Sequence, residues 1–286
     1  MKAYFLGHLG LGDNLYNIGA VQFLSEYYEK VFFLCKNKYR DNLNLIFSEN
    51  NKIVCLPLIT ESEVSFDEEI EKVREVLQDK YNDNECDVFI SGFANKPHHA
   101  EKITNPAFLS CSIPNNPSYN LNCDMITDDH YWFIKDMYSH AKLTLAVMFD
   151  YWKMPFTPES QEMYQSVKHY RIVFLQTRTS NDKELNILKL KDKYIHDKGT
   201  ILISNDENLY ATYDNPNEDI QTKRRLCEQF VGNKLVHYMD TLMNSNEIYI
   251  IDSCFVGLVL PLYKKGMLKA NPLRIIIRKI AHTIEL

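Results

Sequence analysis

The apolar positions of the first half of the chain predict strands that alternate with helices. Residues 3–6 form a short apolar run, and further strand-like runs cover residues 31–35, 52–56 and 87–91. After the first run, apolar side chains recur every three or four positions, which is typical of one helix face. These are Leu15, Ile18, Val21, Leu24 and Tyr28. With an acidic helical pattern over residues 66–80, the order indicates βα units around a parallel sheet.

The second half repeats this alternation after a proline-containing linker at residues 154–158. Strands are predicted over residues 171–176, 200–204 and 247–251, with a short one over 235–238. Residues 95–125 are rich in Asn, Pro and Ser and predict a long excursion. Near the end, apolar residues at helical spacing predict a terminal helix over 273–286. These are Leu273, Ile276, Ile277, Ile280 and Ile284.

Length and composition narrow the class of protein. A chain of 286 residues with 45% hydrophobic residues supports packed cores, and we expect two modest domains. The formal net charge of −6 and the absence of a basic run argue against a nucleic acid partner. The seven cysteines form no CxxC pair, which favours a reducing compartment, and we expect a cytoplasmic protein. No signal peptide or membrane span is predicted.

The glycines are informative because only 9 of 286 residues are glycine, yet Gly7, Gly10, Gly12 and Gly19 fall within the first 19 positions. A glycine turn between a strand and a helix start is suited to binding an anion or a sugar hydroxyl. Asp13 stands where a helix cap is expected, and it is equally compatible with capping alone. The order of the glycine spacings is the reverse of the GxGxxG dinucleotide fingerprint.

A second set of polar residues follows the predicted strands of the second half, where open α/β sheets bind ligands. It comprises three segments: residues 176–182, residues 204–207 and residues 252–254. In the first segment, Asn181 is a possible helix cap and Arg178 a possible partner of a phosphate group. Each junction alone is equally typical of a surface arginine or of ordinary helix capping. Their occurrence on successive βα units makes them a candidate nucleotide site.

These residues resemble GT-B glycosyltransferases, which have two facing Rossmann-like domains, each a mainly parallel sheet flanked by helices. Residues 7–15 look like the amino-terminal Gly-Asp turn of heptosyltransferases and are similar to the Gly-Leu-Gly-Asn turn of α-1,2-fucosyltransferases. Residues 177–182, 202–206 and 240–253 resemble three fucosyltransferase motifs, with Gln176 in place of the usual histidine; heptosyltransferases share the last. The resemblance covers about the first 25 residues and scattered motifs between 171 and 266.

The resemblance implies an α/β fold with three parts: an acceptor-side domain over residues 1–158, a domain over 159–272 that binds the nucleotide sugar, and a terminal helix over 273–286 that packs on the first domain. It also implies that a sugar is transferred to a glycan hydroxyl with inversion of configuration, from a donor similar to GDP-fucose. Asp13 would be the catalytic base, and His8 is the second candidate for that role. Donor-binding residues would be Gly10, Gly12, Thr177, Arg178, Asn205, Asp206, Asp252, Ser253 and Cys254. No metal or cofactor is expected, because no Asp-x-Asp triplet is present.

Two other functions remain open from the sequence. An NAD-linked oxidoreductase would use the first turn, although Glu29 precedes the second predicted strand rather than ending it. A non-catalytic glycan-binding protein of GT-B shape would use aromatic residues near Trp132 and Trp152. The sequence sets neither the acceptor nor the oligomeric state.

Overall fold

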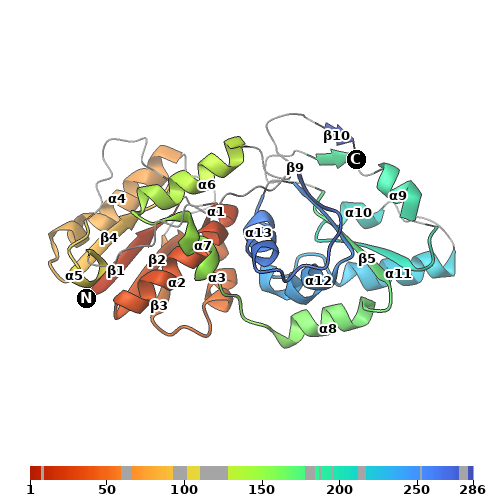
Figure 1. Cartoon of the computed structure of the whole chain (residues 1–286), viewed down its shortest axis with the longest axis horizontal. Helices are drawn as coiled ribbons and strands as arrows, with labels where there is room; N and C mark the ends of the chain where they lie inside the picture. Colours follow the sequence, from red (N-terminus) through yellow and green to blue (C-terminus); the bar gives the residue numbers. More distant parts are fainter. Residues whose placement is uncertain are drawn as a thin grey trace. The chain divides into compact units, whose positions relative to one another are not determined.

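The computed structural model describes residues 1–7, 10–58, 66–92, 102–109, 128–177, 184–186, 188–194, 196–211, 217–251, 253–276 and 283–285. The chain divides into two compact units, one of Met1–Asn122 with Asp128–Pro155, the other of Cys123–Thr127 with Phe156–Leu286. Each unit contains its own parallel sheet (Figure 1). The division at Pro155 lies inside the 154–158 segment that the sequence indicates as a linker.

The first unit has a four-stranded parallel sheet in the order β3-β2-β1-β4. Its strands are β1 (Lys2–Leu6), β2 (Lys30–Lys36), β3 (Ile53–Leu58) and β4 (Cys86–Ile90). Its helices are α1 (Leu11–Tyr16), α2 (Ile18–Tyr27), η1 (Asn37–Tyr39), α3 (Arg40–Ile46), α4 (Phe66–Asn82), α5 (Pro106–Leu109), α6 (Asp128–His140) and α7 (Leu145–Asp150). The four strands predicted here are confirmed.

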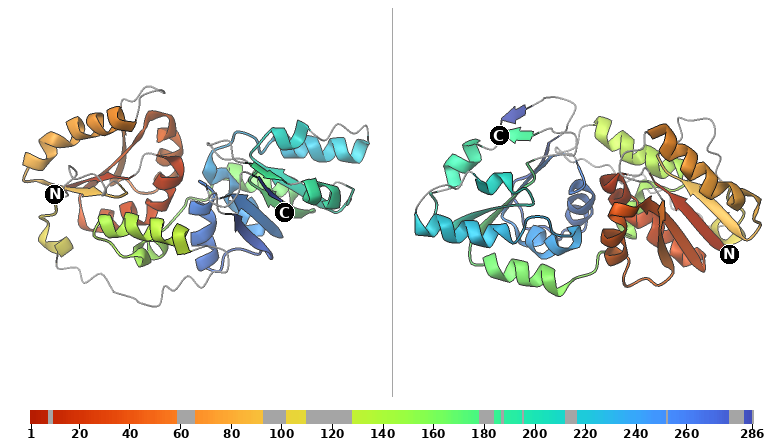
Figure 2. Two further views of the ribbon diagram at one scale, coloured as in Figure 1. Left: turned by 90° about the horizontal axis from the view of Figure 1, so that it is seen from above. Right: turned by 180° about the vertical axis from the view of Figure 1, so that it is seen from behind.

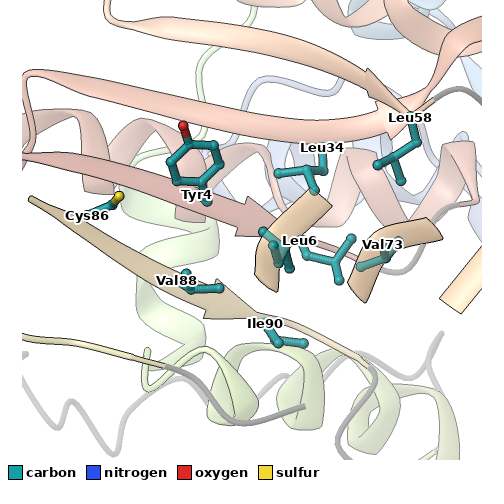
Figure 3. Packing of buried hydrophobic residues seen from close by; sticks show 9 residues of the cluster. Tyr4, Leu6, Leu34, Leu58, Val73, Cys86, Val88 and Ile90 are labelled. Atoms are coloured by element: carbon teal, nitrogen blue, oxygen red, sulfur yellow. The ribbon is translucent and has the colours of Figure 1, made fainter. Parts of the chain in front are cut away.

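Alternate residues of β1 supply the two faces of this sheet, because side chains point to opposite sides along a strand. Tyr4 and Leu6 pack with residues of β4 and with Val73 of α4 (Figure 3). On the opposite face, the ring of Phe5 packs edge-on against Phe33. Helix α4 therefore covers one face of the sheet. The α4 side chains in the core are Val73 and Leu77, both buried.

Helix α2 is tied to α7 at a glycine. A Cβ added at Gly19 would lie 2.6 Å from the carbonyl oxygens of Val147 and Met148. Those atoms belong to the backbone and do not move aside readily, so only glycine permits this approach. Gly19 therefore supports helix packing, although it belongs to the glycine cluster of the sequence.

The second unit has the strand order β7-β5-β8-β9, with every neighbouring pair parallel. The strands are β5 (Arg171–Leu175), β7 (Thr200–Ser204), β8 (Glu247–Ile251) and β9 (Leu273–Ile276); β6 (Glu184–Asn186) and β10 (Thr283–Glu285) form a separate parallel pair. The helices are α8 (Pro158–Val167), α9 (Leu188–Tyr194), α10 (Asn208–Ala211), α11 (Glu218–Glu228), η2 (Leu235–Tyr238), α12 (Met239–Asn244) and α13 (Val256–Lys264). Figure 2 shows the elements of each unit from two further directions.

The core of the second unit is aromatic. Phe174 of β5 packs against Tyr238 and Phe255, and Phe230 lies beside Tyr238. All four rings are fully buried. Large rings of this kind contribute much of the apolar area that a sheet and its helices remove from water, and here they fix η2 and the start of α13 against β5.

Four sequence predictions need correction. The helix expected after the glycine turn is two helices, α1 and α2, separated at Asn17. Residues 235–238 form a 3₁₀ helix rather than a strand. The helix that Asn181 was to cap is absent at Glu184–Asn186, which form strand β6; residues 178–183 lie outside the described residues.

The terminal helix over residues 273–286 is also wrong where it is described. Leu273–Ile276 form β9, which pairs with β8 in the second sheet, and Thr283–Glu285 form β10. Consecutive isoleucines are β-branched and favour a strand, and Leu273 and Ile275 are buried on alternate positions. The helical spacing was therefore coincidental, and β9 belongs to the sheet of the second unit.

Candidate functional site

Each sheet has an amino edge, where its parallel strands begin, and a carboxyl edge, where they end. In open α/β sheets, ligands bind outside the carboxyl edge at the strands where the strand order reverses. The first sheet reverses between β1 and β4, and the second beside β5, whose neighbours are β7 and β8. Two candidate sites follow, the first turn after β1 and the junctions after β5, β7 and β8.

The first turn places Asp13 beside a glycine. Gly10 is the residue that precedes α1, and Asp13 lies half-buried in the first turn of that helix. A Cβ added at Gly10 would lie 2.4 Å from Asp13 Oδ2, so glycine leaves room for the carboxylate. Gly10 occupies the N-cap position, and Asp13 is the third residue of the helix, in its first turn. Gly12 lies in the same turn, and His8 lies outside the described residues.

The buried side-chain amide of Asn17 holds this turn in place through hydrogen bonds. Asn17 Nδ2 donates to the backbone oxygen of Asp13 at 2.9 Å, and Asn17 Oδ1 lies 3.0 Å from Ser91 Oγ. A Cβ at Gly7 would come within 2.6 Å of Asn17 Nδ2, which explains the glycine there. Ser91 directly follows β4, so this network joins the ends of the two strands at which the order reverses.

Asn14 is the unusual member of the first turn. Its side chain is fully buried, yet neither its amide nitrogen nor its amide oxygen has a hydrogen-bond partner within the part of the chain that the structure describes. A buried polar group without a partner costs about 1–3 kcal/mol. A bound ligand or an ordered water would complete the hydrogen bonds of such a group.

The second site brings together the three junctions that the sequence indicates. Thr177 Oγ1 donates to Asp206 Oδ2 at 2.7 Å, and the amide nitrogen of Gln176 donates to Ser253 Oγ. Asp206 Oδ1 also accepts from the backbone nitrogen of Asn208 at the start of α10. These contacts link the ends of β5, β7 and β8 at one carboxyl edge. Their role in binding a donor stays a prediction.

An open acceptor also lies at this edge. Gln176 is 3% exposed, and its Oε1 atom has no partner among the described residues. Burial raises the pKa of the Cys254 thiol, which favours its neutral form. Asn205 lies half-buried between Ser204 and Asp206. Arg178 and Asp252 lie outside the described residues.

The sequence analysis did not predict three polar residues of the first site, Asn14, Asn17 and Ser91. One signal was available: Asn14 and Asn17 stand seven and four positions before Val21 on the helical repeat that also holds Leu24. Two amides on an apolar face are unusual, because burying an amide needs compensating hydrogen bonds. Ser91 gave no comparable signal.

The structure also bears on metals and membranes. Among the described residues, no three His, Cys, Asp or Glu side chains are grouped closely enough to hold a metal ion. None of the helices in the described ranges is both long and apolar enough to cross a membrane.

Comparison with known proteins identifies the fold. The sequence matches no protein-family model and no curated protein. The ADP-heptose LPS heptosyltransferase II of Escherichia coli has a similar structure, with a TM-score of 0.53, 11% identity, and coverage of 99% of this chain and 92% of that one.

Two weaker likenesses were also found. A glycosyl transferase family 9 structure from Veillonella parvula has a TM-score of 0.49 and 12% identity, covering 100% of this chain and 85% of that one. The E. coli heptosyltransferase WaaC with ADP has a TM-score of 0.46 and 14% identity, covering 100% and 90%. The fold of the chain is that of GT-B glycosyltransferases, with two Rossmann-like units, as the resemblance predicted.

Proposed function

We propose that this chain is a glycosyltransferase that moves a sugar from a nucleoside diphosphate donor to a hydroxyl of a glycan acceptor. The observation that carries the proposal is the position of the polar groups. In a fold shared with a heptosyltransferase, both sheets present them at the carboxyl edge where the strand order reverses, and each edge holds a buried amide oxygen without a partner in the described chain. Nucleotide sugars supply the hydroxyl and amide donors that such oxygens accept.

On the acceptor side, Asp13 is the proposed base. Its carboxylate would take the proton of the acceptor hydroxyl while the hydroxyl oxygen bonds to the anomeric carbon and the bond to the diphosphate breaks. Attack from the face opposite the leaving group inverts the configuration. A positioned base of this kind contributes about 10²- to 10⁴-fold. The hydrogen bond from Asn17 to the Asp13 backbone holds the turn that carries the carboxylate. His8 is the reserve base.

On the donor side, the leaving diphosphate needs positive charge as its bond breaks. Arg178 follows Thr177 at the end of β5 in the sequence, and we assign it this role together with the backbone donors near Asp252 and Ser253. Thr177, Asn205, Asp206 and Cys254 would shape the nucleoside pocket. A GDP-fucose-like donor is the leading choice, on the resemblance to α-1,2-fucosyltransferases, and no metal or cofactor is needed for this chemistry.

The oxidoreductase alternative has less support. An NAD site needs an acidic residue at the end of the second strand to bind the ribose. Glu29 instead precedes β2 and pairs with the terminal amine of Met1 at 3.3 Å, while Lys36 ends β2. A non-catalytic glycan-binding protein would differ from the enzyme only in lacking turnover, so the experiments measure turnover as well as binding.

We expect nucleoside diphosphates to raise the melting temperature of the protein in the presence of EDTA, and a panel of GDP, UDP and ADP sugars to identify the donor. The Arg178→Ala variant should lose most of that shift, because a charge-assisted contact contributes about 1.5–3 kcal/mol. Arg225→Ala, which changes an exposed arginine of α11, is the matched control and should behave as wild type. Melting curves that no nucleotide moves would contradict the proposal.

A further inference from the structure

A pocket of about 360 Å³ lies in the first unit, and Asp13 is not among its lining residues. Its walls come from α2, from the turn between α3 and β3, and from the segment after α7. The volume falls within the range of about 300–1,000 Å³ that small-molecule sites occupy. Every residue that lines it belongs to the described part of the first unit.

The pocket lies toward the amino edge of the first sheet. Asn50 and Lys52 line it and directly precede β3, whereas Asp13 lies at the carboxyl edge. Gln22, also in the lining, lies on α2, nine positions after Asp13 and beyond the break at Asn17. A ligand here therefore occupies a site distinct from the turn that carries Asp13.

Hydrogen bonds hold the walls in place. Gln22 Nε2 donates to the backbone oxygen of Lys153 at 3.1 Å, and Asn50 Nδ2 donates to Ser25 Oγ at 2.9 Å. Lys52 Nζ donates to the backbone oxygen of Ser25 at 2.9 Å. These bonds connect all three wall segments, so the pocket is formed before any ligand binds, which lowers the entropic cost of binding.

One acceptor inside this framework is open. Gln22 Oε1 is buried and has no hydrogen-bond partner among the residues that the structure describes. The orientation of this amide is fixed, because turning it over would place its oxygen against the carbonyl oxygen of Lys153. The open atom is therefore an acceptor, and an O–H or N–H group of a water or of a ligand would complete it.

The charges around the pocket balance. Glu26 and Glu49 line it with two carboxylates, and Lys52 and Lys153 line it with two ammonium groups. An anionic ligand would meet the carboxylates and a cationic one the lysines, so an uncharged ligand suits the lining best. Phe47, Tyr151, Met154 and Pro155 supply apolar surface.

From these features we infer a second saccharide site, a pocket for one neutral sugar residue whose hydroxyl donates to Gln22 Oε1 and whose apolar face lies on the aromatic and proline side. A neutral sugar combines hydroxyl donors with a C–H face, as this lining requires. The site goes beyond the proposed transfer reaction and does not depend on it, because it would bind sugar in an enzyme and in a non-catalytic protein alike.

The test is a titration of the full chain, followed by saturation-transfer NMR, with galactose, N-acetylglucosamine and lactose as probes. Glucose 6-phosphate and glucosamine serve as charged probes of similar size. We expect a neutral sugar to bind more tightly than either charged one. Gln22→Leu removes the open acceptor at similar volume and should weaken binding about tenfold, the effect of one lost buried hydrogen bond.

Two further variants separate blockage from general damage. Glu26→Trp places a large ring on the exposed pocket rim and should abolish binding; Glu75→Trp makes the same change on an exposed position of α4, outside the pocket, and should leave it unchanged. Melting curves confirm that each variant is folded. Absence of saccharide binding, binding that Gln22→Leu and Glu26→Trp leave unchanged, or a preference for a charged probe would overturn the inference. Loss of transfer activity in Asp13→Asn with sugar binding retained would show that the two sites are independent.

Discussion

Buried polar side chains at the amino edge of each sheet differ from those at the carboxyl edge in how completely they are hydrogen-bonded. At the amino edges, the buried carboxylates of Asp87 and Glu247 have partners on both oxygens. At the carboxyl edges, the buried amides of Asn14 and Gln176 keep atoms without a partner in the described chain. The same contrast between these residues appears in both units; Gln22, in the pocket toward the amino edge of the first sheet, is an exception, because its buried Oε1 has no partner among the described residues.

Glu247 shows how complete an amino-edge cluster is. One oxygen accepts from Arg171 at 2.5 Å and from Tyr194 at 2.6 Å, and the other accepts from Tyr249 at 2.6 Å. Burial by itself would raise the pKa of Glu247, but the two tyrosine hydrogen bonds and the arginine outweigh it and hold the pKa below its usual range. The carboxylate stays ionised within the fold.

Asp87 has the same role in the first unit. It accepts from Tyr28 at 2.7 Å, from the backbone and hydroxyl of Thr104 at 2.7 and 2.6 Å, and from the backbone of Asn105 at 2.8 Å. Burial and the bond to Asp87 raise the pKa of Tyr28, so its hydroxyl remains a donor. These hydrogen bonds hold residues 104–105 against β4.

The contrast indicates which polar residues serve the fold and which serve a ligand. A closed cluster offsets its own desolvation, whereas an open buried atom costs about 1–3 kcal/mol until something binds it. Changes at the carboxyl edges should therefore reduce binding or turnover with little loss of stability, and changes at the amino edges should do the reverse. Four variants test this division.

The largest effect is expected for Asp13→Asn, which keeps the shape of the side chain and removes its basicity. Turnover of the nucleotide sugar should fall about 10²- to 10⁴-fold, with the melting temperature nearly unchanged, as steady-state assays and calorimetry would show. Asp41→Asn alters the exposed acidic residue in the first turn of α3 and serves as the control. Equal turnover in both variants would remove Asp13 from the reaction.

Glu247→Gln should destabilise the protein by about 3 kcal/mol near pH 7, because it breaks a buried, hydrogen-bonded charge cluster. The stability that a depressed pKa adds is complete above the unfolded value of about 4.3 and is lost as the pH falls from there toward the lower pKa of the folded state. The difference between wild type and variant should therefore shrink as the pH falls through about 4. Urea denaturation at pH 7 and pH 3.5 measures it, and an equal gap at both pH values would rule out this explanation.

Gln176→Leu should give the opposite result at the other edge. It removes the open acceptor together with the bond to Ser253, so stability should change by less than about 1 kcal/mol, since an apolar group of similar size replaces a half-satisfied one. Affinity for a nucleoside diphosphate should fall about tenfold. A large loss of stability with unchanged affinity would reassign Gln176 to the fold.

Gly10→Ala is expected to have the smallest effect. The added Cβ meets the end of the Asp13 side chain rather than backbone, so the protein should fold with a stability change of about 0.5 kcal/mol or less. Displacing the carboxylate should still lower turnover several-fold, because catalysis depends on its position. At Gly199 an added Cβ makes only ordinary contact with Asp197, and Gly199→Ala should keep full turnover.

The sequence allowed the strands and their carboxyl ends to be predicted, because apolar runs and polar junctions are local patterns. It located Asp13, Thr177, Asp206 and Ser253 at strand ends for the same reason. It could not show that Asn17 separates α1 from α2 or that Asn14 is buried with no hydrogen-bond partner among the described residues, since both depend on the tertiary packing, for example the bond between Asn17 and Ser91. The position of β9 depends on pairing with β8, which helical spacing of isoleucines cannot reveal.

The most direct test of the division between edges is calorimetric titration of one nucleoside diphosphate into the wild type, Gln176→Leu and Glu247→Gln, at a temperature where all three are folded. We expect the Kd to rise about tenfold in Gln176→Leu and to stay at the wild-type value in Glu247→Gln. A Kd that changes in Glu247→Gln but not in Gln176→Leu would contradict the account.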